Sequence, residues 1–138
     1  MNLFVYGTLM IPSVMYAVTA SRFRFTDAIL RGYARYTVKG ESYPGIIPAA
    51  DAVTQGIICF GVDEISLKRL DEFEGDLYQR TPIMVETKTE ETYNAETYAI
   101  RSEYVCCLSF EKWNLKDFSR NHLEAFLETY SGFQKNYK

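Results

Sequence analysis

The sequence predicts an α+β fold in which a curved or closed mixed sheet is flanked by helices. Most of the chain consists of segments rich in strand-forming residues, and long helical patterns occur in mid-chain and near the C-terminus. Strands and helices do not alternate, so a repeated βαβ arrangement is not expected. The 138 residues contain no linker or repeat, and we therefore expect a single domain spanning residues 1–138.

The N-terminal segment predicts a buried strand followed by a short helix. The run 3–6 is apolar and aromatic and ends at Gly7, which is typical of a buried strand. A helix is expected within 8–20, because Pro12 suits the first turn of a helix.

Several β-prone segments come next. The segment 29–38 is aromatic and rich in strand formers, with Gly32 as a candidate bulge. Tyr43–Gly45 predicts a turn or the entry to a short strand at 46–47. A further strand is expected at 55–62, where apolar residues recur.

A mid-chain helix is expected after these strands. Asp63 or Ser66 can cap its N-terminus, and Gly75 lies just beyond its expected end near Glu74.

The C-terminal part predicts a hairpin and a last helix. The segments 80–89 and 91–100 are separated by a polar turn and form a candidate β-hairpin. A helix is expected at about 114–131, with Asn114 at its start and Gly132 at its end.

Charge and hydropathy exclude two classes of partner. The formal net charge is -3, whereas nonspecific nucleic-acid binding requires a basic surface. No apolar run approaches the roughly 20 residues of a membrane-spanning helix. We therefore expect neither nucleic-acid nor membrane binding.

Histidine and cysteine are too few for most metal sites. His122 is the one histidine, which excludes zinc sites built from several histidines, and Cys59, Cys106 and Cys107 show no CxxC spacing. An odd cysteine count, and an N-terminal segment without a basic region, favour a reducing cytoplasmic location. We expect no bound metal, buried or inert thiols and a core or half-buried His122.

Glu74 is the most informative charged residue of the mid-chain helix. With Leu67 at zero and about 100° per residue, Leu70 lies at roughly 300° and Glu74 at roughly 340°. The carboxyl is therefore expected on the apolar face, where lost solvation raises a carboxyl pKa towards that of a general base. Alternatively, the helix ends at Phe73 and the Glu74 side chain extends into solvent. Arg80 is a candidate ion-pair partner of Glu74.

The segment Tyr6-Gly7-Thr8-Leu9 lies where the first strand ends. The amides of Gly7, Thr8 and Leu9 could point in one direction and bind a carboxylate or a phosphate. Gly7 would allow a close approach and a positive φ. An ordinary turn without a ligand is the alternative.

Several motifs in the right order resemble one family. Leu3–Leu9, Leu70–Gly75 followed by Tyr78–Arg80, Glu41–Pro44 and Gln55-Gly56 together resemble the γ-glutamylcyclotransferase-like superfamily. The best match is the branch that holds γ-glutamylamine cyclotransferase and the plant avirulence-induced-gene-like proteins. The resemblance covers about residues 3–100.

The resemblance implies a small mixed β-barrel with peripheral helices and a pocket at one mouth. It also implies cyclotransfer on a small γ-glutamyl substrate without a cofactor: the α-amine attacks the γ-carbonyl, giving 5-oxoproline and a free amine. Glu74 would be the general acid and base. The substrate would be bound by the amides of Gly7, Thr8 and Leu9, with walls and hydroxyl hydrogen bonds from Tyr6, Tyr43 and Tyr78.

Some features depart from the family pattern or have no counterpart in it. The loop after Glu74 is short, and no family motif follows Glu103, so the last helix could cover the barrel, cap the pocket or form a homodimer rather than a monomer. A non-catalytic binding or interaction module on the same fold is the alternative function. A cysteine hydrolase would require Cys106 or Cys107 close to His122.

Overall fold

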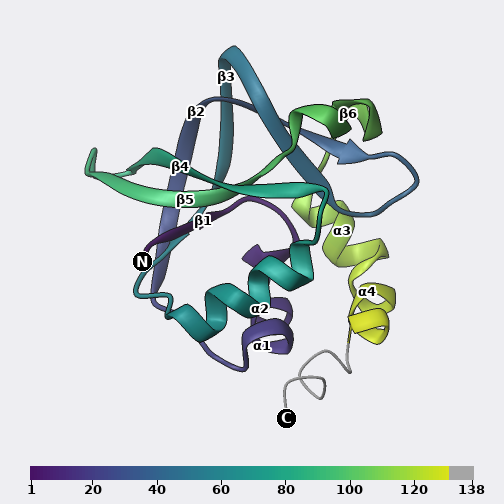
Figure 1. Ribbon diagram of the computed structural model, residues 1–138, viewed down its shortest axis with the longest axis horizontal. Helices are drawn as coiled ribbons and strands as arrows, with labels where there is room; N and C mark the ends of the chain where they lie inside the picture. The colour runs from purple at the N-terminus through teal and green to yellow at the C-terminus, as the bar shows by residue number, and fades with distance from the viewer. Residues whose placement is uncertain (131–138) are drawn as a thin grey trace.

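The computed structural model describes residues 1–130, and within them five strands close into a barrel (Figure 1). The strands follow the order β3-β1-β5-β4-β2, and β2 pairs again with β3. β1 runs parallel to β5, whereas the other pairs are antiparallel, so the barrel is mixed as expected. Its strands are β1 (Leu3–Val5), β2 (Phe25–Val38), β3 (Pro44–Cys59), β4 (Tyr78–Thr87) and β5 (Thr92–Ile100).

The long hairpin of β2 and β3 differs from the prediction. The segments 46–47 and 55–62 were expected as separate strands, but β3 runs through both as far as Cys59. A register shift between Arg31 and Tyr33, at the predicted bulge, accommodates the extra residues of β3. Pairing with β2 on both sides of this irregularity therefore keeps the strand continuous.

The predicted helix within 8–20 is divided in two. A 3-10 turn, η1 (Thr8–Met10), comes first, and α1 (Pro12–Thr19) begins at the proline. Ile11 between them is extended, with φ -85° and ψ 119°. Proline disfavours the helical conformation for the residue before it, so one continuous helix cannot form.

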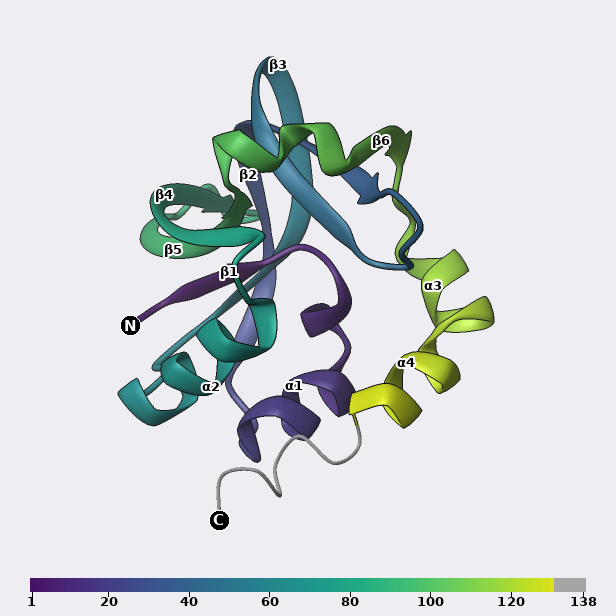
Figure 2. The ribbon, with the colours of Figure 1, turned by 45° about the vertical axis from the view of Figure 1, so that its right-hand side comes forward.

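α2 (Glu64–Glu74) has the predicted bounds and orientation. Leu67 and Leu70 are buried on its inner face. The helix ends at Gly75, whose φ of 73° is unfavourable for other residues. Figure 2 shows α1 and α2 side by side below the barrel.

The β4–β5 hairpin agrees with the prediction, and two further elements follow it. A 3-10 segment, η2 (Ser102–Cys107), leads into β6 (Leu108–Lys112), which pairs with β2 outside the closed barrel. The sequence signals for both were too short and too polar to predict them.

The last helix is also divided. α3 (Leu115–Asn121) begins after Asn114, whose side chain accepts a hydrogen bond from the Asp117 amide. α4 (Leu123–Tyr130) follows a break at His122, where φ is -129°. The break turns the chain, so the expected single helix at 114–131 is wrong. The expected end at Gly132 lies outside the described residues.

The buried residues form two clusters. One fills the barrel and contains Phe4, Tyr6, Ala28, Leu30, Ile46, Ile58, Val85, Ala95 and Ala99. The other lies between the barrel and the helices and includes Leu9, Leu70, Tyr78, Tyr98 and Phe126. The candidate site lies where these clusters meet.

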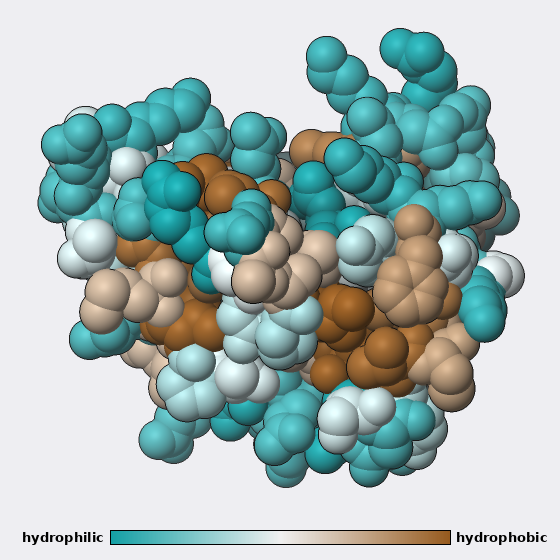
Figure 3. Space-filling model, turned by 90° about the horizontal axis from the view of Figure 1, so that it is seen from above, coloured by the Kyte–Doolittle hydropathy of each residue, from teal (hydrophilic) through white to brown (hydrophobic). Residues whose placement is uncertain are grey.

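The outer surface is mixed in polarity. Phe25, Ile65 and Phe110 are large apolar residues that remain exposed. Seen from above, apolar patches are bordered by hydrophilic side chains (Figure 3). Among the helices in residues 1–130, none is long and apolar enough to span a bilayer.

Candidate active site

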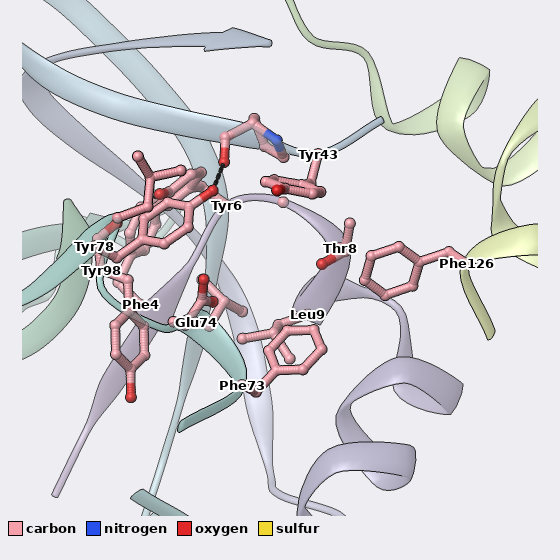
Figure 4. A pocket seen from close by; sticks show the side chains of 14 residues that line it. Phe4, Tyr6, Thr8, Leu9, Tyr43, Phe73, Glu74, Tyr78, Tyr98 and Phe126 are labelled. Carbon is pink, nitrogen blue, oxygen red and sulfur yellow. Dashed lines mark hydrogen bonds between the residues drawn. The ribbon is translucent and has the colours of Figure 1, made fainter. Parts of the chain in front are cut away.

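A cavity of about 170 Å³ lies between the end of β1, the end of α2 and the side of α4. It brings together all seven residues that the sequence singled out, which are Tyr6, Gly7, Thr8, Leu9, Tyr43, Glu74 and Tyr78. In Figure 4, the Glu74 carboxyl and the Thr8 hydroxyl point into the same space from different elements. Segments far apart in the sequence therefore form one site.

The Glu74 carboxyl has a strongly raised pKa. Burial raises its pKa from 4.5 to about 8, and the nearby negative charge of Asp71 adds to the increase. The residue as a whole is partly exposed through the cavity, but no side chain of residues 1–130 forms an ion pair or a hydrogen bond with its carboxyl. The site therefore contains a poorly solvated acid that can exchange a proton near neutral pH.

Arg80 was a candidate partner of Glu74, and this expectation is wrong. Its Nε lies 3.5 Å from Asp71 Oδ1 and 3.5 Å from Glu96 Oε1. Asp71 lies one helical turn before Glu74 and outside the cavity lining, so it attracts the guanidinium away from the cavity. This pairing leaves the Glu74 carboxyl without a cationic neighbour among the described residues.

Tyr98 links the cavity to Asp71. Its hydroxyl donates a hydrogen bond of 2.7 Å to Asp71 Oδ1. Burial, followed by this hydrogen bond, raises the pKa of Tyr98 well above its ordinary value. Tyr98 therefore holds in place the carboxylate that influences the pKa of Glu74.

The turn after β1 provides three free donors. The amides of Gly7, Thr8 and Leu9 donate to no acceptor within residues 1–130, whereas Met10 N donates to Gly7 O at 3.0 Å. Free amides at the start of a helical turn favour an anion. Since all three residues line the cavity, a carboxylate or an oxyanion can use these donors.

Gly7 is required for close approach, not for a positive φ. Its φ is -133° and its ψ is -134°, so the expected left-handed conformation is wrong. A Cβ at this position would lie 2.7 Å from Pro44 Cγ. Contact with the proline, rather than backbone strain, therefore explains the glycine.

Two of the three tyrosine hydroxyls are held by backbone carbonyls. The Tyr6 hydroxyl donates to the Tyr98 carbonyl at 2.5 Å. The Tyr78 hydroxyl donates to the Pro44 carbonyl at 2.7 Å (Figure 4). Their protons are used in these bonds, so the two side chains are walls whose oxygens can still accept a hydrogen bond. Tyr43 lines the opposite side of the cavity.

Comparison with known proteins assigns the family. Residues 3–115 match the family described as "Gamma-glutamyl cyclotransferase, AIG2-like". The chain belongs to this family.

Related sequences and solved structures align with most of the chain. AIG2-like protein C of Arabidopsis thaliana is 32% identical over 136 residues, covering 98% of this chain and 78% of the relative. A solution structure of another Arabidopsis thaliana protein superposes with a TM-score of 0.73 at 28% identity, covering 99% of this chain and 92% of that one. A γ-glutamyl cyclotransferase structure shares the fold, with a TM-score of 0.65 at 17% identity, covering 72% of this chain and 66% of that one.

The helix α4 contributes to the cavity, although no sequence motif indicated that it would. Phe126 of α4 is 7% exposed, lines the cavity and packs edge-on against Phe73, with ring centroids 6.1 Å apart. Of the alternatives for the last helix, the structure supports a cap on the pocket. The remaining lining residues are Phe4, Val5, Pro44, Leu77 and Tyr98.

His122 and the cysteines lie outside this cavity. The His122 side chain is 48% exposed, and its Nε2 lies 3.7 Å from Asp117 Oδ2. Cys59 is buried, which raises the pKa of its thiol to about 11, whereas Cys106 is exposed. None of these residues lines the space that contains Glu74.

Proposed function

We propose that this protein is a γ-glutamyl cyclotransferase that acts on a γ-glutamyl amine or a γ-glutamyl amino acid. The α-amine of the γ-glutamyl group attacks its own γ-carbonyl, which releases 5-oxoproline and a free amine. The proposal depends above all on one observation: a buried carboxyl, whose pKa is raised to about 8, shares a cavity with three backbone amides that donate to no acceptor within residues 1–130.

Glu74 is assigned the proton transfers. An α-ammonium is not a nucleophile, so the ionised carboxylate first accepts one of its protons. The amine nitrogen then forms a bond to the γ-carbon, and the bond from that carbon to the leaving nitrogen breaks as Glu74 returns the proton to it. The new ring nitrogen still carries two protons, so the Glu74 carboxylate removes one of them and passes it to the released amine, which leaves as an ammonium. Water is neither consumed nor produced. A pKa near the working pH suits a group that must both accept and donate.

We assign to the turn after β1 the binding of negative charge on the substrate. The amides of Gly7, Thr8 and Leu9 either anchor the α-carboxylate or stabilise the oxyanion that develops on the γ-carbonyl oxygen. In both cases the donors are fixed before the substrate binds, so little reorganisation is required during the reaction.

The walls of the cavity favour ring closure. Attack within one molecule avoids the entropy loss of a bimolecular step, provided that the chain is held folded. Tyr6, Tyr43 and Tyr78, with Phe73 and Phe126, surround the space in which the γ-glutamyl group would fold back on itself. Aromatic walls also limit the water that would otherwise weaken the electrostatic contacts.

A panel of γ-glutamyl compounds tests the proposal. Purified protein is incubated with γ-glutamyl amines and γ-glutamyl amino acids, and 5-oxoproline and the released amine are both quantified. We expect equal amounts of the two products from at least one compound. Turnover of none would contradict the proposal, and saturable binding without turnover would instead indicate a non-catalytic binding module.

A further inference from the structure

Arg35 lies outside the cavity lining but touches the backbone of the turn after β1. Its Nη1 donates to the Tyr6 carbonyl at 2.6 Å and to the Gln55 carbonyl at 2.9 Å. The side chain extends from β2, so one guanidinium joins β2, β1 and β3 at the edge of the site. The guanidinium retains its positive charge, since arginine is protonated in proteins.

The geometry of the peptide bond relates this contact to the cavity. The Tyr6–Gly7 peptide is trans, and in a planar trans peptide the C=O and the following N–H point in opposite directions. The Tyr6 carbonyl is held towards Arg35, which does not line the cavity. The Gly7 N–H is therefore directed away from Arg35, and Gly7 itself lines the cavity.

A cation on the carbonyl also changes the strength of the donor. A hydrogen bond from a charged group polarises the peptide, and polarised groups in a chain strengthen one another in a low dielectric. The Gly7 N–H consequently becomes a better donor to an anion. Its two neighbours, the amides of Thr8 and Leu9, belong to the same short turn.

We propose that Arg35 is a positioning residue that orients and polarises the Tyr6–Gly7 peptide so that the Gly7 N–H is presented to an anionic group in the cavity. The consequence for turnover rests on the proposed cyclotransferase function. The effect on the Gly7 amide does not depend on that function.

Trp113 keeps Arg35 in this position. The Arg35 guanidinium carbon lies 5.4 Å from the centroid of the Trp113 ring, and Trp113 is 6% exposed. Trp113 Nε1 donates to the Ser42 carbonyl at 2.7 Å. Since Ser42 precedes Tyr43, Trp113 fixes both the guanidinium and the loop that contributes a tyrosine wall. The segment between β6 and α3 thereby supports the site.

The test uses Arg35→Gln, with Arg31→Gln as the matched control. Arg31 lies on the same strand, has a side chain that is 63% exposed and pairs with Glu86, so its loss leaves the cavity intact. The Gly7 amide is followed by ¹⁵N NMR, first in the free protein and then during titration with acetate, a simple carboxylate. Thermal melting of each variant shows whether it is folded.

We expect Arg35→Gln to move the free Gly7 ¹⁵N resonance and to reduce its response to acetate several-fold, whereas Arg31→Gln changes neither. An unchanged Gly7 resonance and acetate response in Arg35→Gln would overturn the proposal. A wild-type Gly7 amide that does not respond to acetate would also overturn it. If Arg35→Gln does not fold, Arg35→Lys replaces it. Lysine retains the charge but not the fork geometry, so we expect an intermediate response, and a wild-type response would overturn the proposal.

Turnover provides an independent readout. We expect Arg35→Gln to lower kcat/KM about 10- to 100-fold, less than the loss of a direct oxyanion donor. A change in KM would place the substrate carboxylate at Gly7, and a change in kcat would place the oxyanion there. An active wild type with an equally active Arg35→Gln would contradict the Arg35 proposal alone. Failure of the whole substrate panel would contradict the cyclotransferase proposal and leave the NMR result interpretable.

Discussion

Substitution of Glu74 by glutamine should make the stability of the protein less dependent on pH. The folded state holds the carboxyl proton more tightly than the unfolded state, because burial raises the pKa of Glu74 from 4.5 to about 8. Between these pH values the folded state therefore binds more protons than the unfolded state. The contribution of Glu74 is fully present below about pH 4.5 and is lost as the pH rises to about 8.

The expected magnitude follows from the size of this pKa change. At about 1.4 kcal/mol per pKa unit, raising a carboxyl pKa from 4.5 to about 8 corresponds to roughly 5 kcal/mol. The residue retains some solvent contact, so we expect about 3 to 5 kcal/mol. This is a large part of the 5–15 kcal/mol of a typical domain.

Urea denaturation at several pH values measures the effect. The free energy of unfolding of the wild type, relative to that of Glu74→Gln, should fall by this amount between about pH 4.5 and 8. Glu72→Gln is the control, because it removes a carboxyl from the exposed side of the same helix. A constant difference between the wild type and Glu74→Gln would refute the reasoning, as would an equal change for Glu72→Gln.

Three further substitutions test neighbouring parts of the site. Asp71→Asn removes a negative charge that raises the Glu74 pKa, so the acidic limb of the kcat/KM profile should move to lower pH. Gly7→Ala places a Cβ 2.7 Å from the proline ring in the cavity wall, and should cost about 1–3 kcal/mol in urea denaturation and reduce turnover. Phe126→Ala removes a buried ring from the cavity, and should raise KM and cost about 3–5 kcal/mol, unlike Phe110→Ala, which truncates a side chain that is 57% exposed.

Each of these expectations has a clear contrary result. An acidic limb that stays in place in Asp71→Asn would show that this charge does not influence Glu74. Wild-type stability and turnover in Gly7→Ala would show that the turn can move away from the proline without consequence. Equal effects of Phe126→Ala and Phe110→Ala on KM would show that α4 does not shape the cavity.

Local sequence signals indicated part of the candidate site, since the helical period alone placed Glu74 beside the buried leucines of α2. The turn after β1 was recognisable because a glycine follows a fully apolar strand. The continuity of β3 was not predictable, because it depends on pairing with β2 across a register shift. Likewise, neither the break at His122 nor the position of Phe126 follows from helical spacing, which continues unchanged through both.

Contacts between residues far apart in the sequence were also not predictable from the sequence. The hydrogen bond from Tyr98 to Asp71 spans 27 residues, and that from Arg35 to Tyr6 spans 29. Both depend on how the barrel closes, which brings β5 beside β1 and β2 beside β3. From the sequence alone, the roles of Tyr98 and Arg35 are indistinguishable from those of an ordinary core tyrosine and an ordinary surface arginine.

The most direct test of the central claim is the rate at which Glu74→Gln releases 5-oxoproline from the best γ-glutamyl compound of the panel. Glutamine preserves the shape of the side chain and removes the proton-accepting carboxylate. We expect the rate to fall at least about 100-fold, while Glu72→Gln remains close to the wild type. A Glu74→Gln rate equal to that of the wild type would contradict the assignment of Glu74 as the general acid and base.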